Sequence, residues 1–139
     1  MTAPENKHQF IRNIFAEDFG AVRRYIASGG SVNFEDEKGN TPLLVAIETF
    51  NTELVELLLS SGADPNKFTD YATPLNAAID VSVEAYKNEE TEVCSTDIIE
   101  RLLAHGANVM LADKKGRTAY DFAKNYHLPA EKLFNSLNI

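Results

Sequence analysis

The side chains best suited to covalent chemistry are Cys94 and the three histidines, His8, His105 and His127. A thiol beside a histidine could act as nucleophile with a base, because the thiolate is the reactive form of cysteine. Cys94 and His105 fall at opposite ends of one predicted helix, which separates them by about 16 Å at a rise of about 1.5 Å per residue. The other histidines are dispersed along the chain. These positions therefore predict no catalytic pair.

No other pattern in the sequence assembles reactive groups. The seven glycines occur singly or as the pair Gly29-Gly30, so no glycine-rich loop could cradle a phosphate. The sequence also lacks a Gly-x-Ser-x-Gly nucleophile motif and His or Cys pairs at metal-ligand spacing. Adjacent carboxylates such as Glu89 and Glu90 fall in a predicted loop, where solvated surface is the simplest interpretation. We therefore expect no enzyme activity, no cofactor and no metal.

The charge balance restricts the class of partner. The chain has 139 residues with 13 basic and 21 acidic side chains, which gives a net charge of -8. Nucleic acids and anionic membranes require clustered Lys and Arg, so neither is an expected partner. An acidic surface would suit a basic protein, since opposite fields speed encounter. The alternative is that the acidity merely keeps a small protein in solution.

The sequence also predicts a compartment. Cys94 is the single cysteine, so no internal disulfide can form, which favours a reducing environment. The first 20 residues contain no apolar run of signal-peptide length, and no stretch reaches the ~18 to 20 apolar residues that span a bilayer. We expect a soluble, cytoplasmic protein.

Two stretches predict paired helices of one design. Thr41 and Pro42 open an apolar run, a second apolar run covers residues 54–59, and Gly62 follows. Threonine is a favoured helix cap, and proline suits the first helical position, where no amide donor is lost. The pattern returns with Thr73-Pro74-Leu75, then at residues 98–103, with Gly106 after it.

This pattern resembles the ankyrin repeat, a unit of about 33 residues with a β-turn, two helices and a Thr-Pro-Leu-His-x-Ala signature. The resemblance implies an all-α fold, a solenoid of stacked helix-turn-helix units with β-turn fingers. It covers residues 1–139 as a single domain, with repeats at about 5–35, 36–68, 69–112 and 113–139. The first and last repeats lack the full signature, as expected of polar caps, and such caps predict a monomer.

The third repeat is longer than the second. Thr41 and Gly62 are 21 residues apart, whereas Thr73 and Gly106 are 33 apart. About 12 extra residues therefore fall within residues 81–95. Because stacking of the repeats does not require this insertion, we expect it to recognise a partner.

Local patterns predict the form of the insertion. Apolar residues keep helical spacing as far as Tyr86, which predicts that the first helix continues for about two extra turns. Residues 87–92 are expected to form an exposed acidic loop. Ser95 or Thr96 would then cap the next helix.

The turns carry further expectations. Gly39 suits the tip of a finger because it can adopt a positive φ. The finger at residues 67–72 is one residue shorter and has no glycine, so we expect a distorted turn with Tyr71 near its tip. Between the helices of the second repeat, at residues 50–52, Asn51 is the residue expected to adopt a left-handed conformation.

The resemblance also implies a binding surface, because in ankyrin-like stacks partners dock on the finger tips and first helices. Transferring those exposed positions gives the protein-binding candidates Glu37, Lys38, Asn40, Val45, Glu48, Thr49, Asp70, Tyr71, Asp80, Val81, Lys114, Lys115, Arg117, Phe122, Asn125 and Tyr126. The extended first helix of the third repeat adds Glu84 and Tyr86, which it would raise beyond the neighbouring repeats. Tyr71, Phe122 and Tyr126 are the expected anchors, since aromatic side chains dominate binding hot spots. The alternative for Phe122 is packing against the third repeat.

These features together predict a non-catalytic protein–protein interaction module, an inhibitor or adaptor. One form resembles bacterial immunity or antitoxin proteins, in which an acidic surface could mask a basic toxin. A second resembles regulatory or host-directed adaptors of the cyclin-dependent kinase inhibitor type. A structural fragment of a larger repeat array is the remaining alternative.

Overall fold

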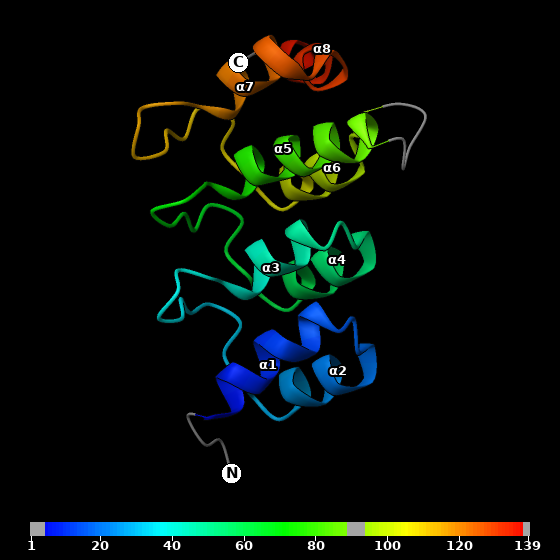
Figure 1. Ribbon diagram of the computed structural model, residues 1–139, viewed down its shortest axis with the longest axis vertical. Helices are drawn as coiled ribbons and strands as arrows, with labels where there is room; N and C mark the ends of the chain where they lie inside the picture. Colours follow the sequence, from blue (N-terminus) through cyan, green and yellow to red (C-terminus); the bar gives the residue numbers. More distant parts are fainter. Residues whose placement is uncertain (1–4, 89–93, 138–139) are drawn as a thin grey trace. The chain divides into compact units, whose positions relative to one another are not determined.

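A computed structural model of the protein describes residues 5–88 and 94–137, and within these ranges the chain forms eight α-helices and no strand (Figure 1). This confirms the predicted all-α fold class. The chain divides into two compact units, the first ending at Asp64 and the second beginning at Pro65. Each unit contains two helical pairs.

The first unit contains α1 (Glu5–Phe15), α2 (Phe19–Ala27), α3 (Pro42–Glu48) and α4 (Thr52–Ser60). Helix α1 packs against α2 and α3, and α3 packs against α4. The core of this unit is formed by side chains at helical spacing, with no more than 4% of their surface exposed: Phe10, Ile14, Val22, Leu43, Ala46, Ile47, Leu54, Val55, Leu58 and Leu59.

The second unit contains α5 (Pro74–Lys87), α6 (Asp97–Ala104), α7 (Ala119–Tyr126) and α8 (Leu128–Ser136). Helix α5 packs against α6 and α7, and α7 packs against α8. The fingers that precede α5 and α7 extend to the same side of this unit (Figure 1). This arrangement places the finger tips beside the first helix of each pair.

Threonine caps begin three helices, two of them at the predicted positions. The hydroxyl oxygen of Thr41 accepts the Leu44 amide at 3.0 Å, and Thr73 accepts the Asn76 amide at 3.1 Å. Thr118 opens α7 and forms a reciprocal capping box with Asp121. The caps satisfy amide groups that the first turn of a helix leaves without partners.

The extra length of the third repeat extends its first helix. Helix α5 has 14 residues against 7 in α3, which confirms the predicted extension. Ser82 and Ala85 in the extended part are buried, however, so the expectation that stacking requires none of the insertion was wrong. Lys87 ends α5 and Asn88 caps it, while the remainder of the expected acidic loop lies outside the described residues.

Two details of the helix boundaries differ from the predictions. Phe50, not Asn51, adopts the left-handed conformation, with φ of 57°. Asn51 is instead the cap of α4, because its side-chain oxygen accepts the Leu54 amide at 3.0 Å. Thr96 occupies the cap position of α6, but its hydroxyl donates to Glu100. The Ser95 hydroxyl oxygen instead accepts the Asp97 amide at 3.1 Å, so the predicted boundary is right and Ser95 supplies the hydroxyl contact.

Asparagine side chains make matching pairs of long-range hydrogen bonds in the two units. In the first unit the Asn33 amide donates to the Gly62 carbonyl at 2.8 Å, and its oxygen accepts the Asp64 amide at 2.7 Å. In the second unit Asn66 makes the same pair of contacts, to the Gly106 carbonyl at 3.1 Å and from the Asn108 amide at 2.7 Å. Both bridges bind the turn that follows the second helix of the next repeat.

The junction between α7 and α8 contains a buried histidine. His127 is 1% exposed and caps α8, because its Nδ1 accepts the Ala130 amide at 3.1 Å. Its Nε2 lies 3.1 Å from the carbonyl oxygen of Ser95. A neutral ring with its hydrogen on Nε2 satisfies both contacts. Burial lowers the pKa of His127, against the opposing effect of its hydrogen bond to Ser95.

Leu58→Ala tests the packing of the first unit. Leu58 is fully buried in α4, so removing its side chain should lower the free energy of unfolding by about 2 to 5 kcal/mol. Urea denaturation of the variant and the wild type measures this loss. A loss below about 1 kcal/mol would contradict the packing of α4 described above.

Acidification tests the role of His127. Because the folded state lowers the pKa of this group, the unfolded chain binds the proton first as the pH falls. Its contribution to stability is therefore complete above about pH 6.5 and is lost as the pH falls below that value. Urea midpoints should fall more between pH 7.5 and 5.5 for the wild type than for His127→Asn. Equal falls in the two proteins would exclude His127 as the responsible group.

Candidate functional site

Helices α5 and α7 line an open groove in the second unit, here called the α5–α7 groove. It has a volume of about 230 Å³ and is lined by Ile79, Asp80, Val83, Glu84, Lys87, Phe122 and Tyr126. Four of the predicted site residues, Asp80, Glu84, Phe122 and Tyr126, thus come together at one place. The extension of α5 supplies part of the wall, since Val83, Glu84 and Lys87 lie beyond the seven residues that α3 has.

The aromatic side of the groove comes from one face of α7. Phe122 and Tyr126 are four residues apart, and their ring centroids are 6.4 Å apart with the planes tilted by 41°. Phe122 is half-buried, so part of the ring packs within the unit and part remains accessible; its role as an anchor stays a prediction. Tyr126 is 65% exposed.

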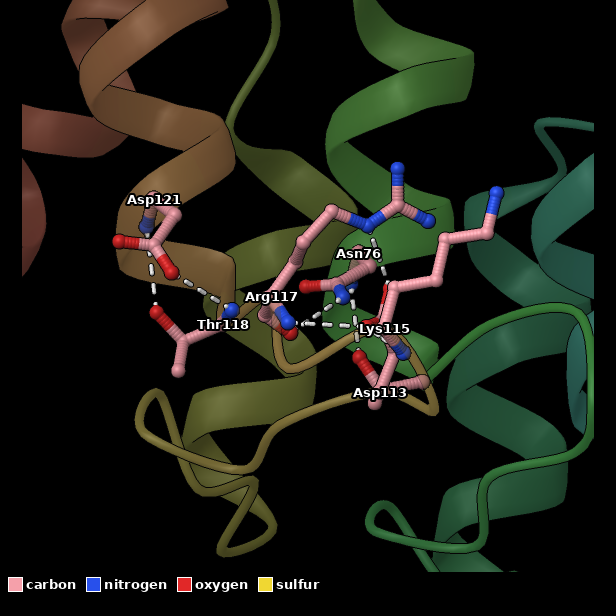
Figure 2. A network of polar contacts seen from close by, with 7 residues as sticks. Asn76, Asp113, Lys115, Arg117, Thr118 and Asp121 are labelled. Atoms are coloured by element: carbon pink, nitrogen blue, oxygen red, sulfur yellow. Dashed lines mark hydrogen bonds and ion pairs between the residues drawn. The ribbon is translucent and has the colours of Figure 1, made fainter.

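The finger before α7 is held by one carboxylate, which the sequence analysis did not single out. Asp113 Oδ1 accepts the backbone amides of Lys115 and Arg117, each at 2.9 Å. Its Oδ2 accepts the Arg117 side-chain Nε at 2.9 Å (Figure 2). Burial alone would raise the pKa of Asp113, but these hydrogen bonds outweigh it and lower the pKa.

Arg117 is therefore a structural residue as well as a predicted binding residue. Its guanidinium carbon lies 4.8 Å from the centroid of the Phe122 ring. Its carbonyl oxygen accepts a hydrogen bond from the Asn76 side-chain amide at 3.4 Å (Figure 2). The finger before α3 repeats the same design, because Asp36 Oδ1 accepts the amides of Lys38 and Asn40, each at 2.9 Å. An Asp-x-x-Gly pattern, with Gly39 and Gly116 at positive φ, was the signal in the sequence.

The intervening finger has a different turn. Thr69 takes the place of the aspartate, and its hydroxyl oxygen accepts the amide of Tyr71 at 3.1 Å. Tyr71 is 73% exposed near the tip, as the shorter finger predicted. Asp70 forms an ion pair with Lys114 of the following finger, so these two predicted site residues neutralise each other. An exposed pair of this kind adds little stability.

Six of the predicted positions lie in the first unit. Val45 is fully buried, so its assignment to an exposed surface was wrong; α3 buries every residue from Pro42 to Ile47. The Asn40 amide is engaged by Asp36, and the Thr49 hydroxyl donates to the Ala46 carbonyl at 2.8 Å. The exposed side chains among these candidates are Glu37, Lys38 and Glu48.

Four more candidates in the second unit lie outside the lining of the α5–α7 groove. Val81 and Tyr86 both lie in the extended part of α5. Val81 is half-buried, and Tyr86 is 49% exposed. Lys115 is exposed at the finger tip. Asn125 is exposed on α7, and its side-chain amide donates to the Asp121 carbonyl at 2.9 Å.

Residues 5–88 and 94–137 were also compared with the requirements of a metal site and of a membrane-spanning helix. No group of three or more His, Cys, Asp or Glu side chains in these ranges could hold a metal ion. In the same ranges no helix has both the length and the apolar character needed to cross a membrane.

Comparison with known families identifies the repeats. The family profile described as "Ankyrin repeats (3 copies)" matches residues 13–88, which is more than half of the chain. The chain belongs to the ankyrin-repeat family. Members of this family are in general non-enzymatic modules for protein–protein interaction.

The alignments with curated relatives cover most of this chain but only a small part of each relative. BRCA1-associated RING domain protein 1 of Caenorhabditis elegans is 32% identical over 75% of this chain and 13% of that protein. Ankyrin repeat, SAM and basic leucine zipper domain-containing protein 1 of Notamacropus eugenii is 31% identical over 88% of this chain and 24% of that protein. Inactive serine/threonine-protein kinase TEX14 of Bos taurus is 29% identical over 84% of this chain and 7% of that protein. The chain thus spans less than a quarter of each of these relatives.

Substitution of Asp113 tests the finger that supports the groove. Asp113→Ala leaves two backbone amides without their acceptor and should lower the free energy of unfolding by about 1 to 3 kcal/mol. Asp113→Asn keeps an oxygen for those amides and loses only the bond to the Arg117 side chain, so its loss should be smaller. Urea denaturation measures both. Equal stability of Asp113→Ala and the wild type would mean that the network contributes nothing.

Proposed function

We propose that the chain is a non-catalytic protein-binding module that recognises its partner at the α5–α7 groove and the adjoining extension of α5. The observation that carries this proposal is the length of α5, which has seven residues more than α3. The added turns form one wall of a groove that also contains two accessible aromatic rings. Aromatic side chains at the centre of a concave surface are typical of binding hot spots.

The chain would act as an inhibitor of a partner protein with a basic surface, or as an adaptor for such a protein. The net charge of -8 favours encounter with such a partner. Binding by an exposed groove needs no reacting groups, and the groove lining includes no nucleophile paired with a base. The chain would act as a monomer, with one groove for each copy.

Tyr126→Ala tests the proposed function. Removing the 65% exposed ring should reduce partner binding at least tenfold, which corresponds to about 1.4 kcal/mol, while the melting temperature stays within a few degrees. Met110→Ala is the matched control, because Met110 is a 57% exposed apolar residue away from the groove lining. The partner is identified by capture from a cell extract on the immobilised protein, with the free protein as competitor. Titration of the captured partner with each variant then measures its affinity.

The outcomes of this experiment are distinct. The proposal fails if no captured protein is displaced by free chain, or if the partner binds Tyr126→Ala as tightly as the wild type. Point substitution is preferable to deletion of residues 81–95, because that deletion would also remove the buried Ser82 and Ala85 and the hydrogen bond between Ser95 and His127.

A further inference from the structure

The lining of the α5–α7 groove has two carboxylates, Asp80 and Glu84, and one basic side chain, Lys87. Asp80 and Glu84 are both exposed and lie four residues apart, on the same face of α5. Among the described residues, neither carboxylate takes part in a salt bridge or side-chain hydrogen bond. Like charges at this spacing destabilise a helix. A cation bound between them would relieve that repulsion.

The opposite wall of the groove is also suited to a cation. The rings of Phe122 and Tyr126 present negative π faces, which attract guanidinium and ammonium groups within about 6 Å. The protein already makes one such contact, since Arg117 lies 4.8 Å from the Phe122 ring centroid. Arg117 does not line the groove, so the largely exposed ring of Tyr126 stays accessible to a second cation.

The groove lining also includes two apolar side chains, Ile79 and Val83, which could cover the aliphatic stem of a long side chain. Arginine and lysine combine such a stem with a charged head. A purely apolar anchor would instead desolvate the two carboxylates without compensation, and an acidic anchor would be repelled.

We propose that the α5–α7 groove binds a basic side chain of the partner protein, arginine or lysine, with its head between Asp80, Glu84 and Tyr126. The inference rests on the proposed function and names the partner chemistry for the same site. Lys87, which also lines the groove, opposes this binding through its own charge. Its ammonium group therefore limits the affinity of the groove for basic segments.

Two capped peptides test this inference on the full chain, acetyl-Gly-Leu-Arg-Leu-Gly-amide and the same peptide with citrulline in place of arginine. Citrulline has nearly the same shape without the charge. In an NMR titration the arginine peptide should shift backbone amide signals of α5 and α7 and bind at least fivefold more tightly than the citrulline peptide. Asp80→Asn with Glu84→Gln should abolish that preference, and Lys87→Gln should increase affinity for the arginine peptide.

The control and the contrary outcomes complete the test. Asp97→Asn with Glu53→Gln removes the same number and type of charges from exposed helical positions outside the groove and should leave binding unchanged. Equal binding of both peptides, signal shifts confined to other helices, or no binding at about 10 mM peptide would each overturn the inference. If a captured partner binds Asp80→Asn with Glu84→Gln as it binds the wild type, the inference fails while the proposed function stands.

Discussion

Each unit depends on an asparagine side chain that joins two segments distant in sequence through hydrogen bonds to backbone groups. The last turn of a helix leaves carbonyl groups without partners, and a helix as short as α3, with seven residues, is marginal by itself. Asn33 and Asn66 supply one donor and one acceptor each to the turn of the following repeat. The first bridge ties the segment after α2 to the turn after α4, and the second ties the segment before α5 to the turn after α6. Beside the groove, the Asn76 side-chain amide donates to the Arg117 carbonyl at 3.4 Å and so joins α5 to the finger before α7.

The sequence predicts the features that depend on local backbone chemistry. Thr41 and Thr73 mark helix starts because a hydroxyl group is the preferred acceptor for amides of the first turn. Gly39 marks a finger tip because it adopts a positive φ, observed at 81°. The extension of α5 as far as Lys87 follows from apolar spacing, since helical periodicity continues through the insertion. In each case the residues that carry the signal are neighbours in the chain.

The features that the sequence did not predict depend on tertiary neighbours. Val45 is buried because α3 is covered on all sides up to Ile47, which its own short pattern cannot reveal. Asn51 tolerates a left-handed conformation well, but its side chain is needed as the cap of α4, so Phe50 adopts that conformation instead. His127 has a role only once Ser95, 32 residues away, is placed beside it. The groove likewise requires residues from two helices that are separated along the chain.

The insertion in the third repeat also determines which parts of the chain can change in length. Gly29 and Gly62 are 33 residues apart, whereas Gly62 and Gly106 are 44 apart, yet the contacts of Asn66 reproduce those of Asn33. The additional 11 residues are thus absorbed by the extension of α5 and by the link from α5 to α6, while the bridge made by Asn66 keeps its contacts. Because Ser82 and Ala85 are buried, changes in length would be accommodated beyond them, nearer to α6. The proposed recognition surface could therefore diverge at a different rate from the framework that carries it.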